Sequence, residues 1–396
     1  MVNLTKNFMH VGPTELKKIQ LIPEAIICHI DESTLFDSTA NSSEKLARDL
    51  KQNYPQCEYF GHRLEEVFGP EFTRNGAVDK ILRSTSGGVE NTDYEHYMKC
   101  VQSNSQKSQT EQLKQLFNSI KKTTAKEDLL WNIKMEMLVT VARREGCAYI
   151  FIADSATRQA IKMIAMTSKG RGYSVPLDVG VDNNQSFKDL SIMRPMKDIL
   201  SKEIGFYNHF SNITGFETLP YNYSTMMPAK TSIDRLTEEF IVSIEREFPS
   251  TVSTICRTVL KLTPSANINF TKTCAICLMP FEADIGEWRK HITVTDVLDA
   301  DESMTKSKEG CGDCSSPAGG CCGGGGDDEG SKKELQIDVN KFLCYSCQVN
   351  IKDYSEISIE SLPPYVTEAV CDQSRDNRLL SQIKDFLIED SDDDEK

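Results

Sequence analysis

The chain has 396 residues, of which 39% are hydrophobic, and its net charge is −14. This length allows two domains or one large domain with insertions, and the negative charge disfavours a protein that coats a nucleic-acid duplex, so any contact with nucleic acid is expected to be local. The sequence has no apolar run near the length of a membrane span and no signal-peptide pattern at its start, so its 14 cysteines are expected to be mostly reduced thiols in the cytoplasm, with no membrane contact.

Residues 1–65 are expected to form the N-terminal part of an α/β domain. Leu21–Ser33 predicts a buried strand, because its apolar run is short and lies between Pro23 and Asp31. Residues 66–120 then predict a polar insertion, which up to Gln112 is rich in Ser, Asn, Gln and Gly and is expected to be an irregular surface segment.

Residues 121–262 are expected to complete the α/β domain. Lys121–Gly146 predicts the clearest helix, with Thr124 and Glu127 as a capping box and Gly146 as its C-terminal stop. A strand, a helix and a further short strand follow, at residues 148–154, 155–170 and 190–195. This alternation with short links indicates βαβ units and a parallel sheet.

Two further helical stretches end this part of the chain. The first is expected within residues 196–210 and the second within residues 228–262. The second is amphipathic, and the apolar face that its spacing predicts consists of Ile233, Leu236, Phe240 and Ile244.

Residues 270–370 predict a zinc-binding region. They contain two Cys-x-x-Cys pairs, and each pair suits a turn that presents two thiolates to one tetrahedral ion. Four sulfur ligands are typical of a structural zinc rather than a catalytic one. The predicted zinc ligands are Cys274, Cys277, Cys344 and Cys347.

An insertion at residues 301–333 separates the two cysteine pairs. It is rich in glycine, can bury little apolar surface and is expected to be disordered. Its own cysteines are open to two interpretations, a soft-metal site or, more in keeping with the composition, a flexible loop that carries thiols. They are Cys311, Cys314, Cys321 and Cys322. The last residues, 385–396, hold seven carboxylates and one lysine and predict a solvated acidic tail.

Several segments together resemble one family. They are AKEDLL, VARREGC, IADSATRQAIKMI, SKGRGYSVPLDVG, RPMKDILSKEIGFYN, TCAICLMPF and FLCYSCQVNIKD. In this order they are similar to the cytoplasmic tRNA 2-thiolation protein 2 family, from about residue 23 to the tail apart from the two insertions.

The resemblance implies an adenine-nucleotide α-hydrolase-like, Rossmann-like α/β fold. It also implies a heterodimer with cytoplasmic tRNA 2-thiolation protein 1 that binds tRNA and 2-thiolates its wobble uridine, giving 5-methoxycarbonylmethyl-2-thiouridine. The sulfur would come from the thiocarboxylate of a ubiquitin-like carrier. Such a chain acts in the cytoplasm as part of a sulfurtransferase complex.

The sequence departs from an ATP-using member of this fold. SGGVENTD, residues 86–93, follows no buried strand, lies after the first predicted strand rather than before it, and has Glu90-Asn91 where a phosphate loop has Asp-Ser. Residues 153–156 read ADSA where Gly-His is usual, and no cysteine pair lies in the predicted core. We therefore expect no ATP site and no catalysis by this chain alone.

The remaining cysteines of the predicted core are interpreted as scattered single residues. They are Cys28, Cys57, Cys100, Cys147 and Cys256. The first residues resemble the end of the helix that follows the phosphate loop, so the sheet is expected to lack its first strand. A truncated gene model, an isoform and a chain that needs its partner are all consistent with this.

A tRNA contact is expected at Lys169, Arg171 and Arg194, as a strip that faces phosphates. The competing interpretation is structural, because Lys169 and Arg171 follow a helix whose C-terminal dipole they complement.

Two other functions stay open. A stand-alone ATP-dependent tRNA sulfurtransferase is disfavoured by the missing phosphate loop and cysteine pair. A zinc-dependent RING-like interaction module is disfavoured by the helix–strand–helix core and by His291, which lacks the neighbouring ligands of a RING finger.

Overall fold

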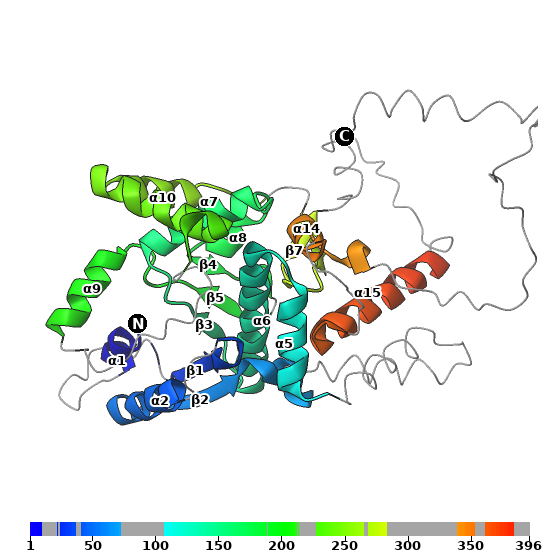
Figure 1. Cartoon of the computed structure of the whole chain (residues 1–396), viewed down its shortest axis with the longest axis horizontal. Coiled ribbons are helices and arrows are strands. Elements are labelled where there is room, and N and C mark those ends of the chain that lie inside the picture. Colours follow the sequence, from blue (N-terminus) through cyan, green and yellow to red (C-terminus); the bar gives the residue numbers. More distant parts are fainter. Residues whose placement is uncertain are drawn as a thin grey trace, which may run out of the picture. The chain divides into compact units, whose positions relative to one another are not determined.

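The computed structural model describes most of the chain outside the two insertions and the tail (Figure 1). The described residues are 1–9, 22, 24–36, 41–72, 107–187, 189–211, 213, 227–264, 268–282, 339–352 and 361–383. They belong to one compact unit, formed by Met1–Glu282 and Val339–Lys396. SGGVENTD, Cys100, the four cysteines of the 301–333 insertion and the acidic tail lie outside the described residues.

The N-terminal part contains a parallel β-α-β unit. After α1 (Val2–Met9), the strand β1 (Ile26–Asp31) pairs with β2 (Glu58–Arg63), with Ile26 opposite Glu58, and α2 (Asn41–Asn53) connects them. Parallel strands need such a crossover because a hairpin turn cannot join them. The predicted strand within residues 21–33 is confirmed, but it is only partly buried, with Ile30 as the one buried residue of β1.

Two helices, α5 (Gln109–Ser119) and α6 (Thr123–Arg144), come after residues 73–106, which lie outside the described residues. The polar insertion predicted over residues 66–120 is expected to be irregular up to Gln112, but Ser108 and Glu111 form a complete capping box and start a helix at Gln109. Leu113, Leu116 and Phe117 are buried, so the helix is held by its packing as well as by its cap.

The long helix α6 is confirmed, but its predicted capping box is wrong. The helix begins two residues earlier than this capping box requires, because its N-cap is Lys122, which supplies no side-chain cap. The hydroxyl of Thr124 instead accepts a hydrogen bond from the backbone N–H of Ile233, at 3.2 Å. Gly146 follows the helix with a left-handed φ of 68°, as expected for a C-terminal stop.

A second sheet has the strand order β3-β5-β4. Strand β3 (Tyr149–Phe151) runs parallel to β5 (Ser191–Met193), and β4 (Asp182–Asn183) is antiparallel to β5. The connection contains α7 (Ala156–Ser168) and α8 (Val175–Val179). The predicted strands and helices of this region are confirmed, although β1 and β3 belong to different sheets within the described residues.

Three helices complete this part of the fold: α9 (Ser201–Phe210), α10 (Ile233–Glu247) and α11 (Thr251–Val259). Helices α10 and α11 pack on α7 (Figure 1). The predicted apolar face of α10 is wrong in part, because Leu236 and Phe240 are about half exposed while Ile241 is 1% exposed. Ile241 packs with Ala156, Ala160 and other residues of α7 and α11.

The C-terminal region combines a hairpin with helices. Strands β6 (Ile268–Thr273) and β7 (Pro280–Glu282) are antiparallel, and they are followed by α14 (Tyr345–Ile351) and α15 (Pro364–Ile383). The described residues thus form a mixed α/β fold with small parallel sheets. None of their helices combines the length and the apolar character needed to cross a bilayer.

Candidate metal centre

Two short backbone segments bring four thiols together. Cys274 and Cys277 lie on the turn between β6 and β7, whereas Cys344 directly precedes α14 and Cys347 lies in the first turn of that helix. All four Sγ atoms lie within 4.8 Å of one another, and the Sγ atoms of Cys277 and Cys344 are 3.8 Å apart. A tetrahedral ion with metal–sulfur bonds of about 2.3 Å gives sulfur–sulfur distances of about 3.8 Å. The four residues therefore fit a single tetrahedral metal ion.

Backbone hydrogen bonds hold the two segments in place. The N–H of Cys274 donates to the carbonyl of Met279 at 2.9 Å, and the N–H of Leu278 donates back to Cys274 at 2.9 Å. Leu278 has a left-handed φ of 61°, which is uncommon for a residue with a side chain. Between the segments, the N–H of Ala275 donates to the carbonyl of Phe342 at 3.0 Å. The cysteines are thus preorganised by the fold.

The centre is closed to solvent. The exposed fractions of Cys274, Cys277, Cys344 and Cys347 are 0%, 8%, 0% and 2%. The fully buried Tyr365 on α15 adds a hydrogen bond from its hydroxyl to the carbonyl of Ile276, at 3.1 Å. A closed site with four sulfur ligands is the arrangement of structural metal sites, since a catalytic ion needs an open coordination position.

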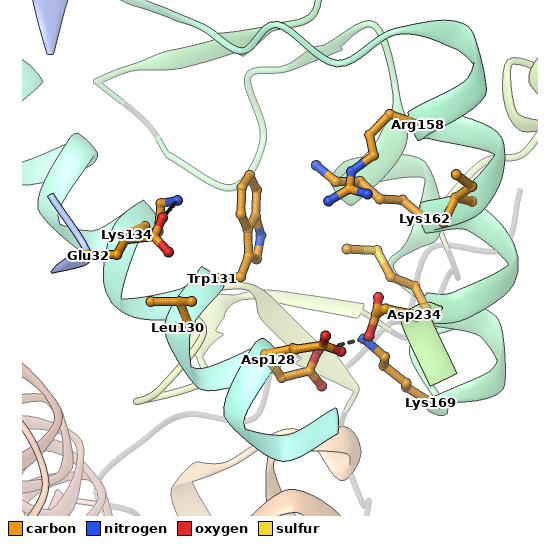
Figure 2. A pocket seen from close by; sticks show the side chains of 12 residues that line it. Glu32, Asp128, Leu130, Trp131, Lys134, Arg158, Lys162, Lys169 and Asp234 are labelled. Carbon is orange, nitrogen blue, oxygen red and sulfur yellow. Dashed lines mark hydrogen bonds and ion pairs between the residues drawn. The ribbon is translucent and has the colours of Figure 1, made fainter. Parts of the chain in front are cut away.

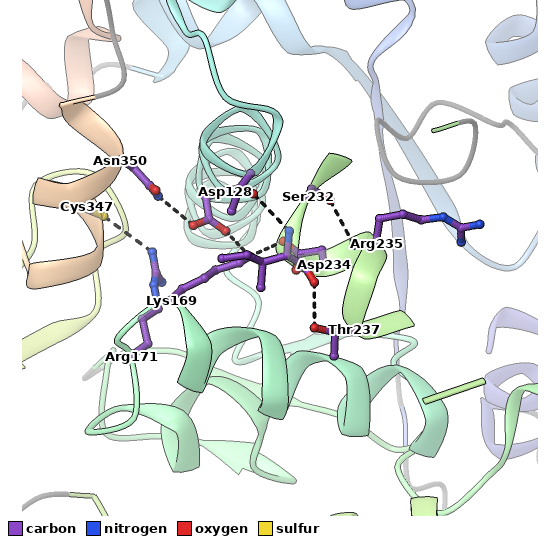
Figure 3. A network of polar contacts seen from close by, with 11 residues as sticks. Asp128, Lys169, Arg171, Ser232, Asp234, Arg235, Thr237, Cys347 and Asn350 are labelled. Carbon is purple, nitrogen blue, oxygen red and sulfur yellow. Dashed lines mark hydrogen bonds and ion pairs between the residues drawn. The ribbon is translucent and has the colours of Figure 1, made fainter. Parts of the chain in front are cut away.

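A buried arginine faces the thiols (Figure 3). Arg171 is 5% exposed, and its Nη2 donates to the Sγ of Cys347 at 3.7 Å. The neighbouring Lys169 bonds Asp128 on α6 at 2.7 Å and also meets Asp234 on α10. Asp128 in turn accepts a hydrogen bond from Asn350 on α14, at 2.8 Å. A polar network therefore joins the metal centre to three helices of the α/β part.

Asp128 and Lys169 of this network are both charged at neutral pH. Burial acts to raise the pKa of the Asp128 carboxyl, but the nearby Lys169 and Arg171 outweigh burial and lower that pKa below its ordinary value. Lys169 has a raised pKa, because its two carboxylate partners outweigh the effect of its burial. Both groups are therefore ionised and form a buried pair with several hydrogen bonds, which is the condition under which buried charges are stable.

A pocket of about 190 Å³ borders the same network (Figure 2). Trp131 of α6 lies between the Glu32–Lys134 pair and the α7 residues Arg158 and Lys162. The Lys162 ammonium lies 4.1 Å from the centre of the Trp131 ring and bonds Asp154 at 2.6 Å. The other wall includes Glu127, Asp128, Lys169 and Asp234. None of the described residues that line the pocket is a cysteine.

The three predicted tRNA contacts do not form one exposed strip. Lys169 and Arg171 lie in the network next to the cysteines, and the Lys169 side chain is 7% exposed. Arg194 is 4% exposed, donates to the carbonyl of Gly180 at 2.9 Å and lies 3.5 Å from Asp154. The charged groups of these residues are buried and paired with protein atoms, so in this conformation they are not accessible to a tRNA phosphate. Their role in tRNA binding stays a prediction.

Sequence reasoning missed Asp128 and Asn350, which connect the four-cysteine region to α6. They are 222 positions apart, and nothing in the local pattern around either residue indicates the contact. Among the described residues, the four cysteines are the one group of Cys, His, Asp and Glu side chains with the geometry of a metal site.

Comparison with known proteins shows which protein family this chain is similar to. The family model for cytoplasmic tRNA 2-thiolation protein 2 matches residues 232–349, which include both cysteine pairs. The human protein of that name is 33% identical over 72% of this chain and 56% of its own length. Cytoplasmic tRNA 2-thiolation protein 2-B of Xenopus laevis is 32% identical over 89% of this chain and 67% of its own length.

The chain belongs to the cytoplasmic tRNA 2-thiolation protein 2 family. It spans only 56% of the length of the human member. Among solved structures, it is similar to the U34-tRNA thiolase NcsA from Methanococcus maripaludis with its [4Fe-4S] cluster, at a TM-score of 0.35 and 11% identity, over 65% of this chain and 78% of that one. A likeness of this size carries no weight for fold or function.

Proposed function

We propose that this chain is the non-catalytic subunit of a heterodimer that 2-thiolates the wobble uridine of cytosolic tRNAs. Its partner is cytoplasmic tRNA 2-thiolation protein 1, and the sulfur comes from the thiocarboxylate of a ubiquitin-like carrier. The product is 5-methoxycarbonylmethyl-2-thiouridine, formed in the cytoplasm. The observation that carries this proposal is family membership, supported by similarity over 89% of the chain to the frog relative.

The burial of the clustered thiols supports a non-catalytic role. A thiol that carries sulfur must meet the sulfur donor and the tRNA, so it must be accessible. The four clustered cysteines are at most 8% exposed and suit a metal ion together. In this proposal the carrier thiols and the ATP site belong to the partner.

We propose zinc as the metal. Tetrahedral coordination by four thiolates is typical of zinc or of iron–sulfur sites. A four-iron cluster lies between its thiolates and holds them farther apart than a single ion does. Sγ atoms that all lie within 4.8 Å of one another therefore favour a single ion.

We further propose that the two parallel strand pairs, β1–β2 and β3–β5, are parts of one adenine-nucleotide α-hydrolase-like sheet. Both pairs are parallel, and α6 packs against both β1 and β3. An open parallel sheet with helices on its faces is the architecture in which ligands bind at the carboxyl ends of strands. The pocket beside Glu32, directly after β1, has that position.

A reconstituted reaction tests the proposal. The purified chain, its partner, ATP, the thiocarboxylated carrier and unmodified tRNA are combined, and 2-thiouridine is measured together with AMP. We expect 2-thiouridine only when both chains are present, and no AMP from this chain alone. AMP formation and tRNA thiolation by the isolated chain would instead support the stand-alone sulfurtransferase.

A further inference from the structure

We infer that Arg171 is a positioning residue that offsets part of the negative charge of the four-cysteine metal centre, and that through Lys169 and Gly170 the bound metal holds one wall of the pocket on α6. This inference rests on the proposed metal, but it does not depend on the reaction in which the protein takes part. It predicts that metal binding and the structure of the pocket wall change together.

The first argument is charge. Four thiolates around a divalent ion carry a net charge of −2, and a buried charge is costly unless an opposite charge is near. Arg171 is itself 5% exposed and donates from Nη2 to the Sγ of Cys347 at 3.7 Å. The metal–thiolate centre and the guanidinium thus each reduce the cost of burying the other.

The second argument is the backbone that presents Arg171. Helix α7 ends in a Schellman motif, in which the N–H of Gly170 donates to Thr167 at 3.1 Å and the N–H of Arg171 donates to Met166 at 2.9 Å. Gly170 has a left-handed φ of 80°, and a Cβ there would lie 2.6 Å from the ring of Tyr345, between the two cysteines of α14. The end of α7 therefore packs directly against the segment Cys344–Cys347, which carries two of the four clustered thiols.

The third argument is the connection to the pocket. Asn350, three positions after Cys347, donates to Asp128, which also bonds Lys169 (Figure 3). Lys169 continues the network to Asp234 on α10. Asp128, Lys169 and Asp234 all line the pocket. Displacement of α14 after metal loss would remove the Asn350 contact and the packing against Gly170 at the same time.

The first experiment measures zinc affinity of the full chain by competition with a chromogenic chelator. Arg171→Gln removes the charge that faces the centre, and we expect one zinc per chain to remain but to bind roughly tenfold to a hundredfold more weakly, as is typical when an outer-sphere partner is lost. Arg171→Lys should recover part of the loss, since it restores the charge without the planar donor.

Arg194→Gln is the matched control. Arg194 is also buried, at 4% exposed, but its partners are Asp154 and Gly180 rather than a cysteine. A general loss of stability would affect both variants alike. We therefore expect wild-type zinc affinity for Arg194→Gln.

The second experiment measures how zinc removal affects the pocket wall formed by Asp128, Lys169 and Asp234. Hydrogen exchange of the full chain is compared before and after zinc removal by chelation. We expect faster exchange at the end of α7 and at the start of α10 after zinc loss, with little change in β1 and β2. Asn350→Ala, which keeps all four cysteines, should speed exchange at the start of α10 while zinc stays bound.

The outcomes separate the two proposals. A wild-type chain that binds no zinc removes the metal proposal and this inference with it. A wild-type chain that binds zinc, with Arg171→Gln binding equally tightly, overturns this inference alone. If Arg171→Gln does not fold, hydrogen exchange of the wild type decides: unchanged exchange at the end of α7 and at the start of α10 after zinc removal overturns the inference.

Discussion

Gly170 shows how a single residue can link two distant parts of the chain. We expect Gly170→Ala to destabilise the protein more than Gly146→Ala. Both glycines have a left-handed φ, which costs about 1–2 kcal/mol for a residue with a side chain. A Cβ at Gly146 meets nothing within 4 Å, whereas a Cβ at Gly170 meets the ring of Tyr345 at 2.6 Å. Urea denaturation of both variants measures the difference, and equal losses would show that the contact with Tyr345 is unimportant.

Glu127 gives the stability of the fold a dependence on pH. Burial, with a contribution from Asp234, raises its pKa from 4.5 to about 7, although Ser232 and Lys169 act in the opposite direction. Between these two values the folded chain binds more protons at this residue than the unfolded chain does, so its contribution to stability falls as the pH rises from about 4.5 to about 7.

Glu127→Gln should remove this dependence, because the amide does not titrate. The variant should therefore gain stability relative to the wild type as the pH rises from 5 to 7.5, as measured by denaturation midpoints at both values. A constant difference between variant and wild type across this range would show that Glu127 titrates normally in the folded chain.

At the scale of elements, helix α10 buries a different face from the one that holds most of its apolar residues. Ile241→Ala should destabilise the protein by about 2–5 kcal/mol, since Ile241 is 1% exposed and packs against α7 and α11. Phe240→Ala should change stability little, because the ring is 51% exposed. Thermal unfolding of the two variants tests this. A larger loss of stability for Phe240→Ala would show that the face predicted from the sequence pattern is the buried one.

The sequence pattern predicts where the helices lie better than it predicts which face of each helix is buried. Helices α6 and α7 follow from periodicity and terminal glycines. The face of α10 does not, because the buried stripe is Thr237, Ile241 and Glu245, and two of these residues are polar. Thr237 bonds the carbonyl of Ile233 at 2.7 Å and Glu245 meets Lys202 at 3.4 Å, so local partners make their burial possible.

The same limit applies to the candidate site. The spacing of the two Cys-x-x-Cys pairs is enough to predict four thiols at one site. The donor to Cys347 could not be found in this way, because Arg171 is 176 positions away and its local sequence is equally consistent with a surface cation. Long-range contacts depend on how helices pack, which a local pattern does not contain.

At the scale of the whole molecule, the four-cysteine cluster joins segments that are far apart in sequence. Cys344→Ser should lose zinc and lower the unfolding temperature, because structural zinc contributes free energy to folding. Cys371→Ser is the matched control: Cys371 is 1% exposed, lies on α15 and is not among the four clustered thiols. Metal analysis and thermal unfolding compare the two, and undiminished zinc in Cys344→Ser would exclude the site.

The most direct test of the proposed function is made in cells. The gene for this chain is deleted, and thiolated tRNA is measured by its retardation in a gel that contains a mercury compound, with and without reintroduction of the gene. We predict that the retarded band disappears on deletion and returns with the gene. Wobble-uridine thiolation that persists after deletion would contradict the assignment of this chain to the thiolating complex.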